Sequence, residues 1–133
     1  MQQQTIETLR QALQESALPF AQQEPLASHT TFQIGGPAVF WCTPKNANQL
    51  RRTLALCRAN GVRLLATALR ADAHDLREET LSQTAVIIGS EGRGVCRELL
   101  DAADGTVIIP MQSHCESLNA AVAATIVMWQ MRR

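Results

Sequence analysis

A glycine-rich loop follows a short apolar run in the second half of the chain. Residues 85–88 read AVII, as a buried parallel strand does, and the next six residues read GSEGRG. Gly89, Gly92 and Gly94 allow positive φ angles and close backbone approach, so the loop could bind a ligand through main-chain groups. An ordinary glycine turn before a helix is the better explanation of this loop alone, and Glu91 could simply offset the helix N-terminus.

A second polar segment follows the next apolar run and is longer than a turn requires. Residues 106–109 read TVII, and residues 110–119 read PMQSHCESLN. Ligands in open α/β sheets bind at the carboxyl ends of the strands, so the two specialised loops indicate one shared pocket. Cys115 is a weak candidate for a nucleophile because the sequence places no basic partner beside it. Ser117 could be the N-cap of the last helix.

The hydrophobic pattern predicts an α/β fold in which these loops join strands to helices. We expect a parallel sheet of about four strands with flanking helices. The expected strands lie near residues 38–42, 62–67, 85–88 and 106–109, and the expected helices near 46–59, 94–103 and 118–131. At the N-terminus, Ile6, Leu9 and Leu13 recur at helical spacing and predict a further helix that ends by Pro19.

The segments between these elements are polar or rich in turn residues. Residues 21–28 predict a polar connector, and residues 29–42 predict a hairpin of two strands around the turn Gly35-Gly36-Pro37. Residues 72–80 are polar and acidic, as expected of a crossover connection.

The last expected helix is apolar on all sides. Leu118, Val122 and Ile126 share one face, whereas Ala123 and Ala124 make the other face small and apolar. Such a helix is normally buried on both sides, and a short chain offers little else to cover it. We therefore expect a homodimer in which this helix lies at the interface.

Length and composition suit one α/β domain spanning residues 1–133, with an apolar content of 46%. The formal net charge is zero, so bulk electrostatics does not favour RNA binding. The four cysteines form no C-x-x-C pair and the three histidines are dispersed, so we expect no metal site. The start is polar and no apolar run could span a bilayer, so we expect a cytoplasmic protein without membrane contact.

Taken together, the two loops resemble the second and third motifs of SpoU-type members of the SPOUT RNA methyltransferases. The matching strings are IIGSEGRG, and IPM followed by ESLNAAVA. The resemblance covers residues 62–133 and implies the S-adenosylmethionine-binding half of an RNA 2'-O-ribose methyltransferase, with a dimer formed through the last helix. It also implies a trefoil knot, in which residues 110–133 pass through a loop formed by residues 67–105. The residues that it places around the cofactor are Gly89, Glu91, Gly92, Ile109, Met111, Leu118 and Asn119.

Residues 1–61 resemble a different family. The string LASHTTFQIGGPA, followed by Pro44-Lys45-Asn46 and a helix ending in Asn60-Gly61, is similar to the start of UDP-N-acetylenolpyruvoylglucosamine reductase, a flavin enzyme. In that family a glycine-rich flavin loop follows the next strand, whereas residues 67–72 of this chain contain no glycine. We therefore expect no flavin site.

The two resemblances indicate a chimera joined near residues 61–62. The first SpoU-type motif, which carries an asparagine and the catalytic arginine, belongs in the place that the reductase-like segment occupies. The catalytic residues are therefore unknown, and we expect S-adenosylmethionine binding without turnover. Two alternatives stay open: a natural or engineered chimeric scaffold with no ligand, and a flavin-binding reductase fragment.

Overall fold

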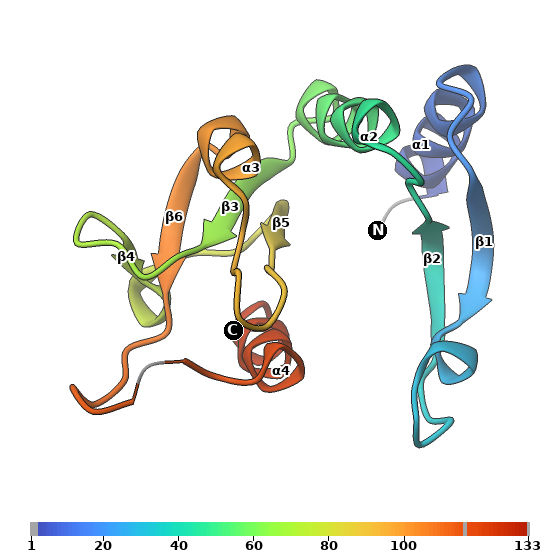
Figure 1. The fold of residues 1–133 in the computed structure, drawn as a ribbon. Helices are drawn as coiled ribbons and strands as arrows, with labels where there is room; N and C mark the ends of the chain where they lie inside the picture. The colour runs from blue at the N-terminus through green and yellow to red at the C-terminus, as the bar shows by residue number, and fades with distance from the viewer. Residues whose placement is uncertain (1–2, 116, 133) are drawn as a thin grey trace. The chain divides into compact units, whose positions relative to one another are not determined.

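The chain divides into two compact units, Met1–Asn60 and Gly61–Arg133. A computed structural model describes residues 3–115 and 117–132 (Figure 1). The division lies within one residue of the junction expected between the two sequence segments. The expected single domain of residues 1–133 remains a prediction.

Four parallel strands form the sheet of the second unit, in the order β4-β6-β3-β5. Their bounds are β3 Arg63–Thr67, β4 His74–Asp75, β5 Thr84–Ile87 and β6 Gly105–Ile108. Leu64, Leu65 and Ala66 of the central strand β3 are all buried, as expected of a parallel strand covered on both faces. The α/β fold with a parallel four-stranded sheet is thus confirmed, as are the strands predicted near residues 62–67, 85–88 and 106–109.

The fourth strand of this sheet is not the one that the sequence predicts. Residues 38–42 pair elsewhere, and β4 joins the sheet instead through the pairs His74↔Val107 and Asp75↔Ile108. This strand lies inside the segment expected to be a polar crossover. Two polar residues carry no alternating apolar signal, so periodicity could not reveal the strand.

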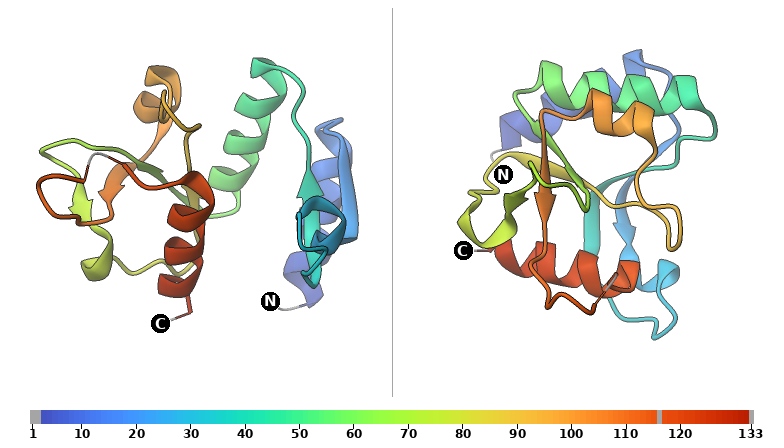
Figure 2. Two further views of the ribbon diagram at one scale, coloured as in Figure 1. Left: turned by 60° about the horizontal axis from the view of Figure 1, so that its bottom comes forward. Right: turned by 60° about the vertical axis from the view of Figure 1, so that its left-hand side comes forward.

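Helix α4 (Ala120–Gln130) covers the apolar core of the second unit. Its Val127 belongs to the buried cluster that also contains Leu65, Leu76, Leu81 and Val107. In Figure 1 and in the right-hand view of Figure 2, β6 runs between α4 and the shorter helix α3 (Arg97–Ala102). Aliphatic packing therefore holds α4 against the sheet. This packing also positions the first residues of α4.

The first unit consists of two helices and an antiparallel strand pair. Its elements are α1 Gln3–Glu15, β1 Phe20–Pro25, the 3-10 helix η1 Leu26–His29, β2 Pro37–Cys42 and α2 Ala47–Ala59. The N-cap of α2 is Asn46, whose side chain accepts a hydrogen bond from the Gln49 nitrogen at 2.9 Å. Gln49 in turn accepts one from the Lys45 nitrogen at 2.7 Å, so the predicted helix start has a capping-box-like pair of bonds.

The predicted hairpin around Gly35-Gly36-Pro37 is wrong in its first strand. The partner of β2 is β1, from Phe20↔Cys42 to Pro25↔Pro37, and β1 lies in the segment expected to be a connector. Thr30 explains the difference, because its hydroxyl accepts from the Ile34 nitrogen at 3.1 Å and donates to the Ile34 oxygen at 3.0 Å. This local closure uses backbone groups that a strand would pair.

A carboxylate beside the sheet of the second unit is bound from two sides. Glu79 pairs with His74 (Nδ1–Oε1, 2.7 Å) and accepts from Arg63 (Nη2–Oε2, 2.5 Å). The bond from His74, followed by that from Arg63, lowers the pKa of Glu79 below its ordinary value. A carboxyl whose folded-state pKa is lowered stabilises the fold above its unfolded pKa and loses this contribution as the pH falls through the folded value.

We therefore expect Glu79→Gln to destabilise the protein at neutral pH and to destabilise it less at acidic pH, as the pH falls through the lowered pKa of Glu79. The loss at neutral pH should be about 1 kcal/mol or less, because Arg63 and His74 are largely exposed. Urea unfolding at the two pH values measures it. The neighbouring variant Glu78→Gln is the control, and equal destabilisation by Glu79→Gln at both pH values would contradict the assignment.

Candidate functional site

The glycine-rich loop after β5 closes on itself. The Gly94 nitrogen donates to the Ser90 oxygen at 2.9 Å, and these two residues form an isolated antiparallel bridge. Gly92 and Gly94 have φ angles of +84° and +66°, which residues with a Cβ adopt only at a cost. The predicted need for glycine at these two positions is thus explained by the turn itself.

The loop itself requires glycine at position 89. A Cβ built on Gly89 would lie 2.0 Å from the Gly94 carbon and 2.3 Å from the Val95 nitrogen, both backbone atoms. This close approach of the returning half of the loop is a second reason for glycine here. The predicted contact between Gly89 and the cofactor stays a prediction.

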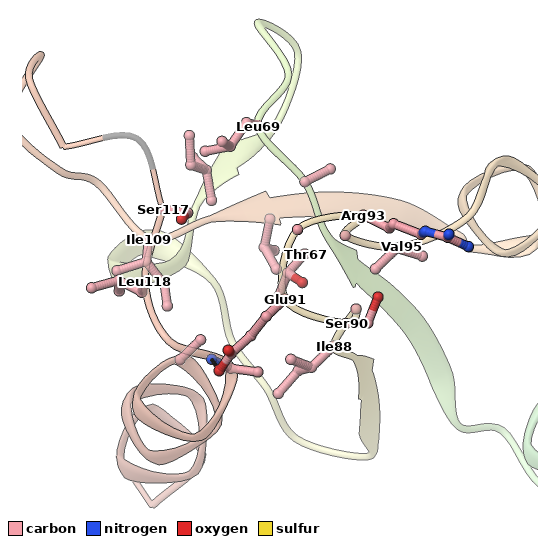
Figure 3. Close-up of a pocket in the computed structure, with 18 of the residues that line it drawn as sticks. Thr67, Leu69, Ile88, Ser90, Glu91, Arg93, Val95, Ile109, Ser117 and Leu118 are labelled. Carbon is pink, nitrogen blue, oxygen red and sulfur yellow. Dashed lines mark hydrogen bonds between the residues drawn. The ribbon is translucent and has the colours of Figure 1, made fainter.

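Glu91 joins the glycine-rich loop to the start of α4. Its Oε1 accepts from Asn119 Nδ2 at 2.5 Å and from the Ala120 nitrogen at 3.3 Å, and Figure 3 shows the side chain directed toward this helix. Asn119 is also the N-cap of α4, since its Oδ1 accepts from the Ala121 nitrogen at 2.9 Å. The N-cap role proposed for Ser117 therefore belongs to Asn119, and Glu91 lies at the N-terminus of α4 rather than of α3.

A cavity of about 790 Å³ lies at the carboxyl ends of β3, β5 and β6 (Figure 3). All seven residues that the sequence assigns to a cofactor line it: Gly89, Glu91, Gly92, Ile109, Met111, Leu118 and Asn119. Ser117 lines it as well, whereas Cys115 does not. Glu116, which belongs to the same polar segment, lies outside the described residues. The structure thus brings the two predicted loops to one cavity.

A third loop, which no sequence motif predicts, lines the same cavity. Residues 67–70 follow β3, which lies between β5 and β6 in the sheet. The run VRLLAT was recognised as a strand, so its carboxyl end could have been placed at the same edge. The residues of this loop have no glycine and no motif that would have drawn attention to them.

Charged groups at the cavity are few. Arg70 binds Asp72 through two bonds, Nε–Oδ1 at 2.9 Å and Nη2–Oδ2 at 3.1 Å, and the bond from Arg70 lowers the pKa of Asp72. Arg93 also lines the cavity. Among the residues that the structure describes, Glu91 is the one lining carboxylate, and it binds the start of α4. The cavity therefore combines apolar walls with polar groups that are mostly held in place by neighbours.

The thiols and the remaining titratable groups point to no second site. Burial raises the pKa values of Cys42 and Cys57 in the first unit, so both thiols are protonated at neutral pH. Within residues 3–115 and 117–132, no three His, Cys, Asp or Glu residues are grouped as a metal site would need. No helix in the same residues has both the length and the apolar character to cross a membrane.

Residues 12–129 match the SpoU rRNA Methylase family. A curated relative, the tRNA (guanosine(18)-2'-O)-methyltransferase of Thermus thermophilus, is 34% identical over 118 residues, which cover 81% of this chain and 61% of the relative. The chain therefore spans less than two thirds of the length of this relative.

Solved structures of similar proteins share the α/β fold. The A. aeolicus TrmH/SpoU tRNA modifying enzyme matches with a TM-score of 0.57 and 30% identity, over 62% of this chain and 43% of that one. The SpoU methyltransferase AviRb from Streptomyces viridochromogenes, in complex with the cofactor AdoMet, matches with a TM-score of 0.56 and 29% identity, over 65% of this chain and 35% of that one.

Proposed function

Since the chain belongs to the SpoU rRNA methylase family, we propose that its second unit is the S-adenosylmethionine-binding part of an RNA 2'-O-ribose methyltransferase-like protein. The observation that carries the proposal is the convergence of seven predicted residues on one cavity at the carboxyl ends of parallel strands. The cofactor-bound state of a structural neighbour supports the same ligand.

The residues around the cavity fit this cofactor. Its volume of about 790 Å³ lies within the range of small-molecule sites. Ile109, Met111 and Leu118 offer apolar contact, and the backbone of the loop from Gly89 to Gly94 offers polar groups. When bound, S-adenosylmethionine would supply an electrophilic methyl group on its sulfonium.

We propose further that the protein is catalytically incomplete. Every residue that lines the cavity belongs to residues 67–123, and neither of the lining arginines, Arg70 and Arg93, stands in the sequence context of the family's first motif. The chimera of residues 1–61 and 62–133 is likewise a proposal, and the division of the chain between Asn60 and Gly61 supports it. The alternatives make different predictions: a flavin-binding fragment would purify as a yellow protein, and a scaffold would bind neither cofactor.

Calorimetric titration with S-adenosylmethionine tests the proposal. We expect saturable binding that its demethylated product, S-adenosylhomocysteine, abolishes by competition. Met111→Glu should weaken binding by at least about tenfold, because a carboxylate would be placed at an apolar wall of the cavity. His114→Glu is the matched control in the same segment, since His114 does not line the cavity. A flat titration of the folded wild-type protein would leave the scaffold as the better account.

Two features of the family remain proposals for this chain. The first is the trefoil knot, in which residues 110–133 would pass through the loop formed by residues 67–105. A crystal structure in which this segment packs without passing through the loop would contradict it. The second is a homodimer formed through α4.

The exposure of α4 side chains assigns the predicted dimer interface to its Val, Met and Trp residues rather than to its alanines. Ala123 and Ala124 are half-buried beside the cavity and core, whereas Val122, Met128 and Trp129 are 47%, 58% and 70% exposed. An apolar surface of this kind marks an interaction site on soluble proteins.

We expect the wild-type protein to be a dimer and Trp129→Glu to raise the dimer dissociation constant by at least about tenfold, because the charge would be buried at the interface. Analytical ultracentrifugation measures this constant. Ile34→Glu in the first unit, where Ile34 is 76% exposed, is the control. A wild-type monomer at micromolar concentration, or equal effects of the two variants, would refute the interface.

A further inference from the structure

One arginine at the cavity differs from the other arginines of residues 61–131 in having no carboxylate partner among the described residues. Arg93 stands between Gly92 and Gly94 in the glycine-rich loop, is exposed, and lines the cavity. Because the loop is closed by the bond between Gly94 and Ser90, the backbone that carries Arg93 is held in one conformation. The loop therefore fixes the position of the Arg93 backbone at the cavity and leaves its guanidinium exposed to solvent.

The other described arginines of residues 61–131 are each paired with a carboxylate. These pairs are Arg63–Glu79, Arg70–Asp72, Arg77–Asp75 and Arg97–Asp101. Arg93 has no hydrogen-bond or ion-pair partner within residues 3–115 and 117–132. Figure 3 shows why Glu91, two residues away, does not neutralise it: Glu91 is directed to α4, whereas Arg93 extends in the opposite direction.

The net charge of the second unit is negative, so an arginine without a carboxylate partner is significant for RNA binding. Residues 61–133 contain seven arginines and nine Asp or Glu residues, so the summed charge repels a polyanion. An RNA strand could approach the cavity only if local cations contacted its phosphates. A guanidinium suits this role because it can donate two parallel hydrogen bonds to phosphate oxygens.

We propose that Arg93 binds a phosphate of the RNA strand whose ribose is presented to the cavity. This inference rests on the proposed function and names one group by which the same site holds its substrate. Arg93 would act as a positioning residue, because it contacts the strand at its phosphate and leaves the reacting hydroxyl to other groups. The same guanidinium could instead bind the carboxylate of the cofactor, and the experiment separates these two sources of an oxyanion.

The test compares Arg93→Gln with Arg97→Gln. Both variants lose one positive charge, but Arg97 is paired with Asp101 and lies four positions after Arg93. A fluorescent single-stranded oligoribonucleotide is titrated at several salt concentrations. Arg93→Gln should weaken binding by about 3- to 10-fold at low salt and should lower the slope of log K against log salt by about 0.7, the value for one phosphate contact with a single strand. Arg97→Gln should leave the slope unchanged.

Calorimetric titration with S-adenosylmethionine completes the test, and Arg93→Gln should bind it as the wild type does. Equal effects of the two variants on RNA, or no RNA binding by the wild type at low salt, would overturn the inference while leaving cofactor binding intact. Loss of cofactor affinity in Arg93→Gln would assign Arg93 to the cofactor carboxylate and would also overturn it. Failure of the wild type to bind the cofactor would refute the proposed function itself.

Discussion

Gly89→Ala is expected to abolish S-adenosylmethionine binding and to lower the stability of the second unit. The added Cβ would lie 2.0–2.4 Å from three backbone atoms of Gly94 and Val95, and backbone cannot rotate away as the end of a side chain can. The loop must therefore open, at a cost of about 1–3 kcal/mol or more for an overpacked site. Calorimetric titration and the thermal midpoint measure the two effects.

Gly92→Ala is the matched control for this prediction. A Cβ on Gly92 meets no atom within 4 Å, so the cost comes only from its φ angle of +84° and should be about 1–2 kcal/mol. The Gly92 variant should retain cofactor binding better than the Gly89 variant. Unchanged binding by Gly89→Ala would show that the loop closure seen here is not needed for the cofactor.

The comparison between Gly89 and Gly92 also shows what a sequence can predict about a loop. Three glycines before a helix identify a loop with special backbone requirements, and that identification is confirmed. The sequence does not say whether a glycine is needed for its φ angle, for a ligand or for another part of the same loop. That distinction depends on where the Gly94 backbone returns, which is a tertiary property.

The buried strands could be predicted because a parallel sheet covered on both faces requires apolar residues along each strand. Apart from the exposed Arg63, the residues of β3, β5 and β6 are buried or half-buried, and short apolar runs of this kind are typical of parallel strands. The strands that the sequence missed, β1 and β4, are polar and partly exposed. The residues of β1 and β4 form strands because β2 and β6 offer backbone groups for pairing. A local sequence pattern does not encode this pairing.

The part of the site that could be predicted consists of the loops that carry a sequence motif directly after a strand. Two loops are predicted to bind a cofactor because of their sequence motifs, and both line the cavity. The loop of residues 67–70 was missed because its contribution depends on the strand order β6-β3-β5, which only the structure supplies. The bond between Glu91 and Asn119 was missed for the same reason, since it joins residues that are 28 positions apart.

Methyl transfer to RNA is expected to be slower by about 10²–10⁴ than in a complete relative of the family. The ribose hydroxyl must be activated and aligned with the sulfonium, and under the proposal above this chain lacks the motif that carries the catalytic arginine in the family. Of the two arginines at the cavity, Arg70 is bound to Asp72, and Arg93 is assigned above to a phosphate. Neither stands in the sequence context of the missing motif.

A tritiated-methyl assay on bulk bacterial RNA measures the rate, with the Thermus thermophilus relative as the active control. The cofactor must be at a concentration that calorimetry shows to saturate the site, so that weak binding is not mistaken for a slow chemical step. Arg70→Gln is assayed beside the wild type. Incorporation comparable to that of the relative would contradict the prediction, and its loss in Arg70→Gln would locate the catalytic group on the loop after β3. Negligible incorporation by a saturated wild type is the expected result, because a pocket that only binds the methyl donor lowers no barrier at the acceptor.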